Sequence, residues 1–272
     1  MIESNDISRK KRGEIDKTFK LSFSEFSGDF LIGLLDDKDP RTRTVSATLL
    51  GEKKYYEAIP SLCKSLIVEK ALYSKIAISE GLGAMGVKAL PELIRYIGKI
   101  GKNHHKELPS EIFKKWSYPL PRDIVIRTIV KMGKSALPNL SDALKIADAA
   151  MAAELIDAIG HISFYSQNTD AFEVLMDVHD KHKQNEVVIW KLLRALQSFN
   201  LPKGTKILEE YFIQSAVPQL RWEAARSLGQ LNEEKILKKG LNDSNPLVKK
   251  MVELGLKHIL DSKRKNLPII CL

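Results

Sequence analysis

Apolar residues recur along this chain at the spacing of one helix face, in runs separated by short polar turns. Ile189, Leu192, Leu193 and Leu196 follow the i, i+3, i+4, i+7 pattern of an amphipathic helix. No run alternates apolar and polar residues between turn signals, so no strand is predicted. The stripes and turns predict helix pairs over residues 40–70, 71–100, 122–148, 149–183, 185–214 and 218–241, followed by a last helix over 246–261.

Glycine and proline punctuate these helices in a regular way. A glycine follows a large apolar residue at Gly51, Gly83, Gly133, Gly160, Gly229 and Gly255. We expect these glycines to end helices in the left-handed conformation, which glycine adopts without a Cβ penalty. An Ala-Ile-Pro or Ala-Leu-Pro unit then follows at Pro60, Pro91 and Pro138. Proline is tolerated in the first turn of a helix, so each unit predicts the start of a second helix.

These marks return about every thirty residues, a period typical of stacked supersecondary units. The predicted fold class is therefore all-α, an α-solenoid of about six to seven stacked helix pairs over residues 21–262. The residues expected to line its core are Leu50, Leu62, Leu66, Leu82, Leu93, Ile129, Leu140, Ile159, Leu193 and Leu228.

Three segments fall outside the repeats. Residues 1–20 are polar and include Arg9-Lys10-Lys11-Arg12, which predicts a mobile, basic N-terminal arm. Ser22 and Glu25 have capping-box spacing, so the first helix is expected to begin near Ser22. Residues 101–121 lengthen one repeat as an insertion, which we expect to be dispensable for folding and important for binding. Residues 263–272 form a C-terminal tail.

Several motifs resemble a known repeat. Residues 39–43 (Asp-Pro-Arg-Thr-Arg), 49–51 (Leu-Leu-Gly) and 58–62 (Ala-Ile-Pro-Ser-Leu) resemble the HEAT repeat, in the short form named after phycobilisome lyases. Residues 221–229 resemble the first helix of another such repeat, and the likeness covers residues 36–260. The resemblance implies that arginine and aspartate side chains tie neighbouring repeats together. The positions that match this structural role are Asp39, Arg41, Arg43 and Arg221.

The net charge of +9 is distributed unevenly. Residues 95–134 carry +7, whereas residues 135–180 carry −7. Basic and aromatic side chains are interleaved in the first of these blocks, a combination that suits phosphate contact and base stacking. The alternative is that the aromatic residues pack the insertion against its repeat while the lysines stay in water. The candidate binding residues are Arg95, Lys99, Lys102, Lys106, Lys114, Lys115 and Trp116.

The acidic block weakens the nucleic-acid hypothesis, because it would repel a phosphate backbone that continued past the basic block. A stacked-helix surface with segregated charge suits a partner of complementary charge. The predicted function is therefore that of a protein–protein interaction scaffold or adaptor, with another protein as its partner. A nucleic-acid-binding HEAT-like module that uses residues 95–134 is the alternative.

Motifs for catalysis are not found in the sequence. Members of the HEAT-like family include chromophore lyases and di-iron hydroxylases, but this chain has no His-Glu dipeptide, which a di-iron hydroxylase of this type would need. His179 and His182 have a spacing at which they could share a metal, but a solvated, polar helix end is the favoured explanation. The prediction is no enzyme, no cofactor and no metal. Cys63 and Cys271 are expected to be reduced and the protein cytoplasmic, with no signal peptide and no membrane span.

Overall fold

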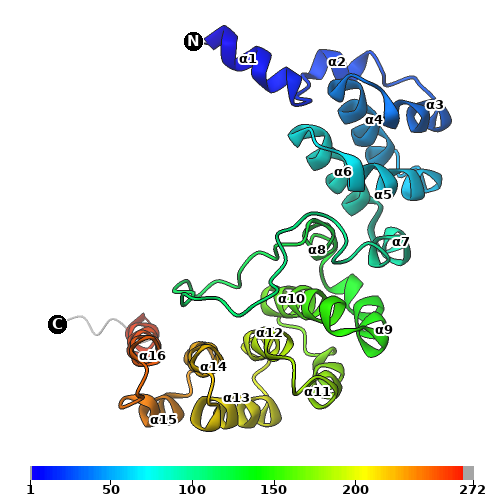
Figure 1. Cartoon of the computed structure of the whole chain (residues 1–272). Coiled ribbons are helices and arrows are strands. Elements are labelled where there is room, and N and C mark those ends of the chain that lie inside the picture. Colours follow the sequence, from blue (N-terminus) through cyan, green and yellow to red (C-terminus); the bar gives the residue numbers. More distant parts are fainter. Residues whose placement is uncertain (1, 266–272) are drawn as a thin grey trace. The chain divides into compact units, whose positions relative to one another are not determined.

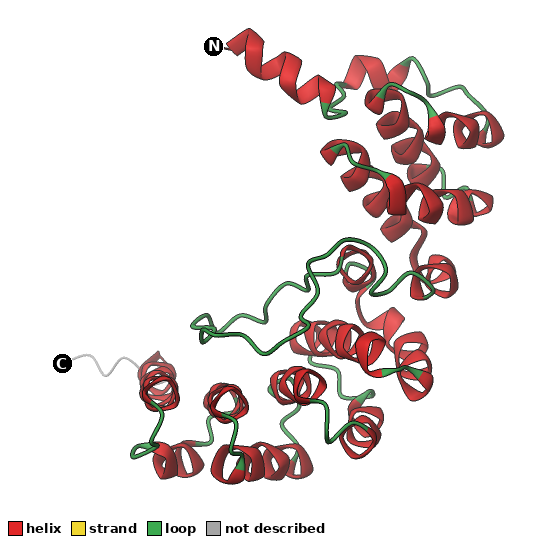
Figure 2. Cartoon of the chain, in the orientation of Figure 1, coloured by secondary structure: helices red, strands yellow, loops and turns green. Residues whose placement is uncertain are grey.

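The computed structural model describes residues 2–265, and all regular structure in that range is helical (Figure 1, Figure 2). The first helices of the pairs are α4 (Pro40–Glu52), α6 (Leu72–Met85), α8 (Ile124–Val130), α10 (Ala149–Ser166), α12 (Glu186–Leu196) and α14 (Pro218–Gln230). Their second helices are α5 (Ile59–Val68), α7 (Leu90–Ile94), α9 (Leu137–Ile146), α11 (Phe172–Lys181), α13 (Pro202–Gln214) and α15 (Glu234–Leu237). The predicted helix pairs and the all-α solenoid fold are confirmed.

Helices outside the pairs lie toward the two ends of the chain. They are α1 (Ile2–Lys11), α2 (Lys17–Leu21), α3 (Gly28–Gly33) and α16 (Pro246–Lys265). Short 3₁₀ turns lead into or follow several helices: η1 (Leu34–Asp36), η2 (Tyr56–Ala58), η3 (Gly86–Ala89), η4 (Gly133–Ala136) and η5 (Lys238–Gly240). None of the described helices is both long enough and apolar enough to cross a membrane.

Side-chain caps fix where the first helices begin. The Asp39 carboxylate accepts a hydrogen bond of 2.9 Å from the backbone N–H of Arg41 at the start of α4. Asp123 caps α8 and Asp148 caps α10 in the same way. Such caps satisfy N–H groups that have no partner inside the helix, which is why the sequence boundaries were predictable.

The chain forms two compact units. Unit 1 comprises the chain up to Lys102 together with Arg122–Asn139, and unit 2 comprises Asn103–Pro121 together with the chain from Leu140 onward. Within unit 1, α6 packs against both α4 and α8. Within unit 2, the first helices pack in the order α10, α12, α14 and α16. Within each unit, successive first helices therefore contact each other, as expected of a stacked array.

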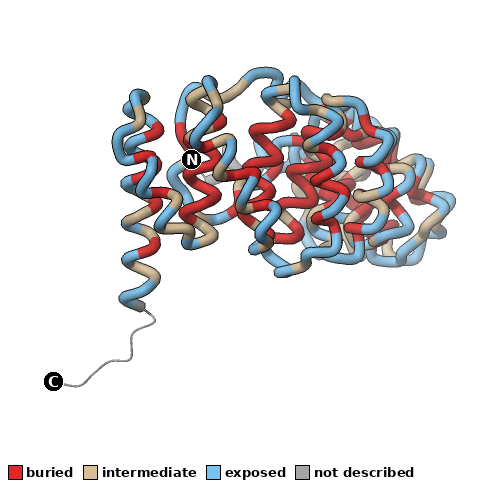
Figure 3. Tube along the Cα trace, turned by 90° about the horizontal axis from the view of Figure 1, so that it is seen from below, coloured by how far each residue is buried: buried red, intermediate tan, exposed pale blue. Residues whose placement is uncertain are grey.

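The core lies between the packed helices, where the buried positions follow the facing sides of the helices (Figure 3). Each of the ten predicted core residues is at most 1% exposed. Burial of such side chains supplies most of the favourable free energy of folding. The helix phase assigned from the apolar stripes is therefore confirmed in both units.

The glycines have a different role from the one predicted. Of the marked glycines, Gly133 has a left-handed backbone, with φ of +65°, whereas Gly51 lies inside α4. A Cβ on Gly51 would collide with the backbone of Gly81 in α6, and a Cβ on Gly229 would lie 3.0 Å from the Cα of Gly255. At these positions the absence of a side chain lets two first helices approach each other closely.

The N-terminal region also differs from the prediction. Helix α2 precedes Ser22, which is its C-cap residue, because the Asp16 carboxylate caps the N–H of Phe19 at 2.8 Å. The helix expected near Ser22 is α3 instead, capped by Ser27. Half of the predicted arm is helix α1, and the N–H of Tyr73 in α6 donates to the carbonyl of Arg12 at 3.0 Å. Cys271 and most of the predicted tail lie outside the described residues.

Candidate functional site

Two of the four predicted inter-repeat residues connect successive turns. Arg43 of α4 donates to both carboxylate oxygens of Glu69, at 2.7 and 2.9 Å, and to the carbonyl of Asp37 at 2.7 Å. Arg221 of α14 makes the same kind of contacts, to Asp243 at 2.8 and 2.9 Å and to carbonyls of the turn before its helix. Each arginine therefore joins the turn before its own helix to the turn before the next first helix.

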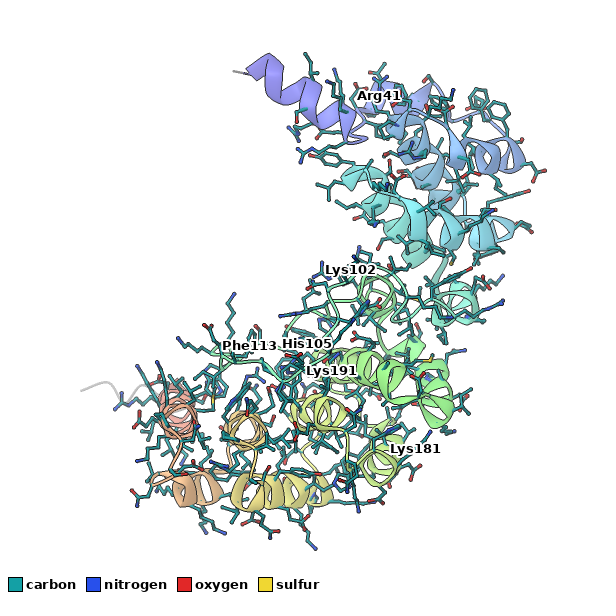
Figure 4. The ribbon with its side chains drawn as sticks, viewed as in Figure 1. Arg41, Lys102, His105, Phe113, Lys181 and Lys191 are labelled. Carbon is teal, nitrogen blue, oxygen red and sulfur yellow. The ribbon has the colours of Figure 1, made fainter. Side chains whose placement is uncertain are left out.

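Arg41 and Asp39 make a different contact. The Arg41 guanidinium pairs with the Asp39 carboxylate at 2.9 Å, within the cap of α4 itself. It also lies 4.8 Å from the centre of the Phe19 ring, where a cation–π contact is favourable. This pair therefore stabilises the start of α4 and the packing of α2 in unit 1, where Figure 4 shows Arg41.

The predicted binding residues do not belong to one compact unit. Arg95, Lys99 and Lys102 lie in unit 1, and all three are exposed. The other members, Lys106, Lys114, Lys115 and Trp116, lie in unit 2. The three lysines of that group are exposed, whereas Trp116 is half-buried. The basic block of the sequence is thus divided between two units.

Residues 103–121, which we call the strap, cross the first helices of unit 2. The strap contains no helix and runs along the side of α10, α12, α14 and α16 that faces away from the second helices (Figure 1, Figure 2). We call this side the first-helix face. The His105 ring lies edge-on to Trp190 of α12, with ring centres 4.8 Å apart. The Trp116 ring stacks on His258 of α16 at 4.2 Å. In Figure 4, His105 and Phe113 mark successive points along the strap.

Glycines of the first helices make room for two aromatic rings of the strap. Tyr118 is 3% exposed and occupies the space that a Cβ on Gly160 of α10 would fill. Trp116 lies against Gly229 of α14, where a Cβ would come within 3.2 Å of the indole. Burial raises the pKa of Tyr118 well above its usual value, so its hydroxyl stays protonated. The aromatic side chains of the insertion therefore pack against helices, as the alternative interpretation expected, but these helices belong to later repeats and not to the repeat that carries the insertion.

Beneath the strap lies a row of six buried ionic side chains, which we call the charged ladder. Its members are Glu154 and Asp157 of α10, Lys191 and Arg194 of α12, and Glu223 and Arg226 of α14. None has a side chain more than 6% exposed. Helix α10 contributes two acids, α12 two bases, and α14 one of each. With three acids and three bases, the formal charges of the ladder sum to zero.

The ladder is connected by ion pairs from helix to helix. Lys191, labelled in Figure 4, places its Nζ 2.8 Å from Glu154 and 2.9 Å from Asp157. Arg194 lies 3.2 Å from Glu223, which is also 3.4 Å from Arg226. Buried charges are tolerated when each is paired in this way. The chain of pairs therefore ties α10, α12 and α14 together across three repeats.

Burial and neighbouring charge act in opposite directions on these groups. Burial alone would lower the pKa of Lys191, but the carboxylates of Asp157 and Glu154 outweigh it and raise that pKa. For Arg226 burial outweighs the attraction of Glu223, and its pKa is lowered. A guanidinium nevertheless stays protonated in proteins. The three basic side chains of the ladder therefore stay charged, and each lies within ion-pair distance of a ladder carboxylate.

Arg226 also binds the main chain of the strap. Its Nη2 donates to the carbonyl of Lys115 at 2.9 Å and to the carbonyl of Ser117 at 3.2 Å. Phe113 lies with its ring centre 4.9 Å from the guanidinium carbon. Carbonyl groups are common to every polypeptide, so this part of the contact recognises an extended backbone independently of its side chains.

The ladder was not predicted from the sequence, although a signal exists. Its residues stand six and three positions before Gly160, Gln197 and Gly229, which are equivalent positions in three consecutive repeats. In a single repeat, a polar pair at i and i+3 is typical of a solvated helix face. Only an alignment of the repeats reveals the order acid–acid, base–base, acid–base. The chain is built of stacked helical repeats.

No family model and no curated protein matches the chain. Solved structures of similar fold include human deoxyhypusine hydroxylase in complex with glycerol, which is 13% identical, with 95% of this chain and 96% of that chain covered and a TM-score of 0.39. The complex of CpcE and CpcF of phycocyanin lyase from Nostoc sp. is 17% identical, with coverages of 88% and 89% and a TM-score of 0.40. A designed armadillo repeat protein is 14% identical, with coverages of 86% and 100% and a TM-score of 0.38. The likeness is weak and concerns the arrangement of helices.

Proposed function

We propose that this protein is an interaction scaffold that binds an extended segment of another protein on the first-helix face of unit 2. The observation that carries the proposal is the hydrogen bonding of Arg226 to two main-chain carbonyls of an extended segment. Recognition of this kind is suited to a polypeptide ligand. Stacked repeats provide a long surface for it, because each first helix contributes the same positions.

The neutral ladder favours a polypeptide over nucleic acid. Binding of nucleic acid depends on cations that neutralise phosphates and release counterions. The ladder cations are already paired with carboxylates, and Trp116 and Tyr118 are packed against helices and thus withdrawn from base stacking. We therefore expect generic DNA or RNA to bind only in the non-specific range of roughly 10⁻⁴–10⁻⁶ M.

Binding is also favoured over catalysis by the protonation states of the buried groups. Lys191 has a raised pKa and stays a cation, so it lacks the free amine of a lysine nucleophile. Burial raises the pKa of the Cys63 thiol to about 12, so this residue stays protonated and unreactive. These groups suit a structural role in a binding surface.

Site-specific photo-crosslinking tests the proposal. A photoreactive residue replaces Lys257, which is exposed on α16 next to His258, and the matched control replaces Lys206, which is exposed on α13 among the second helices. In native lysate we expect a discrete protein adduct at position 257 that excess unlabelled protein suppresses and nuclease leaves intact. Nuclease-sensitive adducts, or tight salt-dependent binding in a gel shift, would contradict the scaffold proposal.

A further inference from the structure

We propose that the strap occupies in cis the site of the partner's segment, and that this segment is an extended peptide with two aromatic residues spaced like Trp116 and Tyr118. The inference rests on the proposed function and adds the chemistry of the partner and a means of regulation. The strap is then a built-in competitor, which a partner segment must displace before it can lie on the first-helix face.

The part of the strap over residues 106–120 has few hydrogen bonds to the helices. Among the hydrogen bonds of the described residues, those that involve residues 106–120 come from two side chains, Arg226 and Tyr165. The Tyr165 hydroxyl donates to the carbonyl of Tyr118 at 3.4 Å, which is a long contact. A segment with so few hydrogen bonds belongs to the low-stability end of local opening reactions. Its displacement breaks these hydrogen bonds, the contact of the His104 ring with Glu154 at 3.8 Å and the packing of its aromatic and apolar side chains.

The site under the strap is formed by the helices themselves. The ion pairs of the ladder run from helix to helix, so they do not require the strap. The spaces that receive Trp116 and Tyr118 exist because Gly229 and Gly160 have no side chain. A site that is ordered before its ligand arrives saves the cost of ordering on binding. The first-helix face can therefore accept another segment with the same two rings.

Near its start, at residues 106–108, the strap fits the helices loosely. A pocket of about 470 Å³ remains open between strap residues 106–108 and the segments 184–187, 217 and 219 at the starts of α12 and α14. The contacts with Arg226 and with the glycines of the first helices come from residues Phe113 to Tyr118, whereas His105 contacts Trp190 nearer the start of the strap. The pattern recognised by Arg226 and the glycines is thus short: two main-chain carbonyls that bind Arg226, and the rings of Trp116 and Tyr118 beside them.

The strap is tethered close to its site, and this tethering determines how much it is expected to weaken the binding of a free peptide. Both ends of the strap continue into unit 1, so the strap is always present near its site. Short tethers give effective concentrations in the mM range. A free peptide therefore binds the intact protein much more weakly than it binds a protein whose strap has been replaced.

A peptide-binding titration on the full chain tests the inference. The probe is a fluorescent peptide of residues 109–120, and the key variant replaces residues 103–121 by a Gly/Ser linker of equal length. We expect the variant to bind the probe at least about tenfold more tightly than the intact protein does. A probe with Trp116→Ala and Tyr118→Ala should lose at least about tenfold in affinity, because it lacks both rings that pack against the helix glycines. The control probe with Lys114→Ala and Lys115→Ala, at exposed positions, should bind like the parent.

A second variant keeps the inference falsifiable if the linker variant does not fold. Tyr118→Ala in the full chain removes one buried ring, and it should fold and bind the probe more tightly than the intact protein does. No probe binding by a linker variant of normal helical content would overturn the inference. Equal binding by Tyr118→Ala and the intact protein would do the same, as would loss of folding in both variants, because the strap would then be a fixed part of the core.

Other results distinguish this inference from the proposed function. A dimer of the intact protein that disappears in the linker variant would assign the site to the strap of a second copy and would overturn the partner-peptide inference. A protein adduct at position 257 that the probe peptide does not suppress would leave the scaffold function intact while contradicting the role of the strap.

Discussion

At the residue scale, the charged ladder shows how a cation can be required in an apolar layer. Lys191 is fully buried and serves two carboxylates from one neighbouring helix. Its stem fills space among apolar residues while its ammonium pairs with the acids. Removing this ammonium is therefore expected to lower the free energy of unfolding more than removing that of an exposed lysine does.

We expect Lys191→Met to lower the free energy of unfolding by about 3–5 kcal/mol, because Glu154 and Asp157 lose the ammonium that they share. Urea denaturation measures the change. Adding Glu154→Gln and Asp157→Asn should recover part of the loss, since the buried negative charges are then removed as well. Lys206→Met, at an exposed position, should stay within about 0.5 kcal/mol of the wild type. A loss as small as that for Lys191→Met would contradict the ladder's structural role.

His161 gives a second prediction at this scale. Its ring lies 5.9 Å from Tyr118 and 4.8 Å from Tyr165, centre to centre. Burial lowers its pKa below the ordinary 6.5, although the charge of Asp157 opposes the shift. The unfolded chain therefore takes up this proton at higher pH than the folded protein does. The stability contributed by neutral His161 is complete above 6.5 and declines as the pH falls toward the lowered pKa.

Thermal denaturation between about pH 8 and about pH 5 should detect this dependence. The Tm of His161→Phe, which keeps an aromatic ring, should fall less steeply in acid than the Tm of the wild type. Identical slopes for the two proteins would show that His161 does not contribute to the acid sensitivity.

At the element scale, glycines decide how closely first helices pack. Gly81 lies in α6, and a Cβ there would come 2.8 Å from the carbonyl oxygen of Ala47 in α4. Gly83 lies two residues further along the same helix, and a Cβ there would have ordinary contacts of 3.9 Å or more. The two positions differ in tertiary packing while they share one helix.

Alanine substitution at these two glycines should therefore have opposite effects. Gly81→Ala should destabilise the protein by about 1–3 kcal/mol, because the helices must move apart. Gly83→Ala should stabilise it by up to about 1 kcal/mol, because alanine loses less entropy in a helix. Urea denaturation of both variants provides the comparison. Stabilisation by Gly81→Ala would mean that the approach of α4 and α6 does not require glycine.

At the scale of the whole molecule, the strap links the sequence of one unit to the helices of the other. Its residues interrupt unit 1 in the sequence but belong to unit 2 by their contacts. Stability in stacked repeats is a sum of local terms, so each unit can respond separately to a change.

We expect replacement of the strap by a Gly/Ser linker to speed amide hydrogen exchange in α10, α12 and α14 by about tenfold, equivalent to ~1.4 kcal/mol. Exchange in α4 and α6 should not change. Lys114→Ala, at an exposed strap position, serves as the control and should leave both sets of helices as they are. Faster exchange throughout the chain would show instead that the two units open as one cooperative block.

The sequence by itself determined the helix pairs, their boundaries and the core. Apolar periodicity and caps such as Asp39 act within one or two helix turns, so their signal lies in neighbouring residues. The candidate site was not accessible in this way. Arg226 and Lys115 are 111 positions apart, and no local pattern encodes their contact.

Tertiary structure alone decided where the insertion lies, which glycines allow close helix packing, and which charges are buried. The sequence grouped Arg95 and Lys99 with Lys114 and Lys115, but they belong to two compact units. No sequence pattern singled out Glu154, Lys191 or Glu223, although they belong to one buried network. Local pattern fixes which side of a helix is apolar, whereas the neighbours of a polar residue depend on how the helices stack, because burial is a property of the assembled repeats.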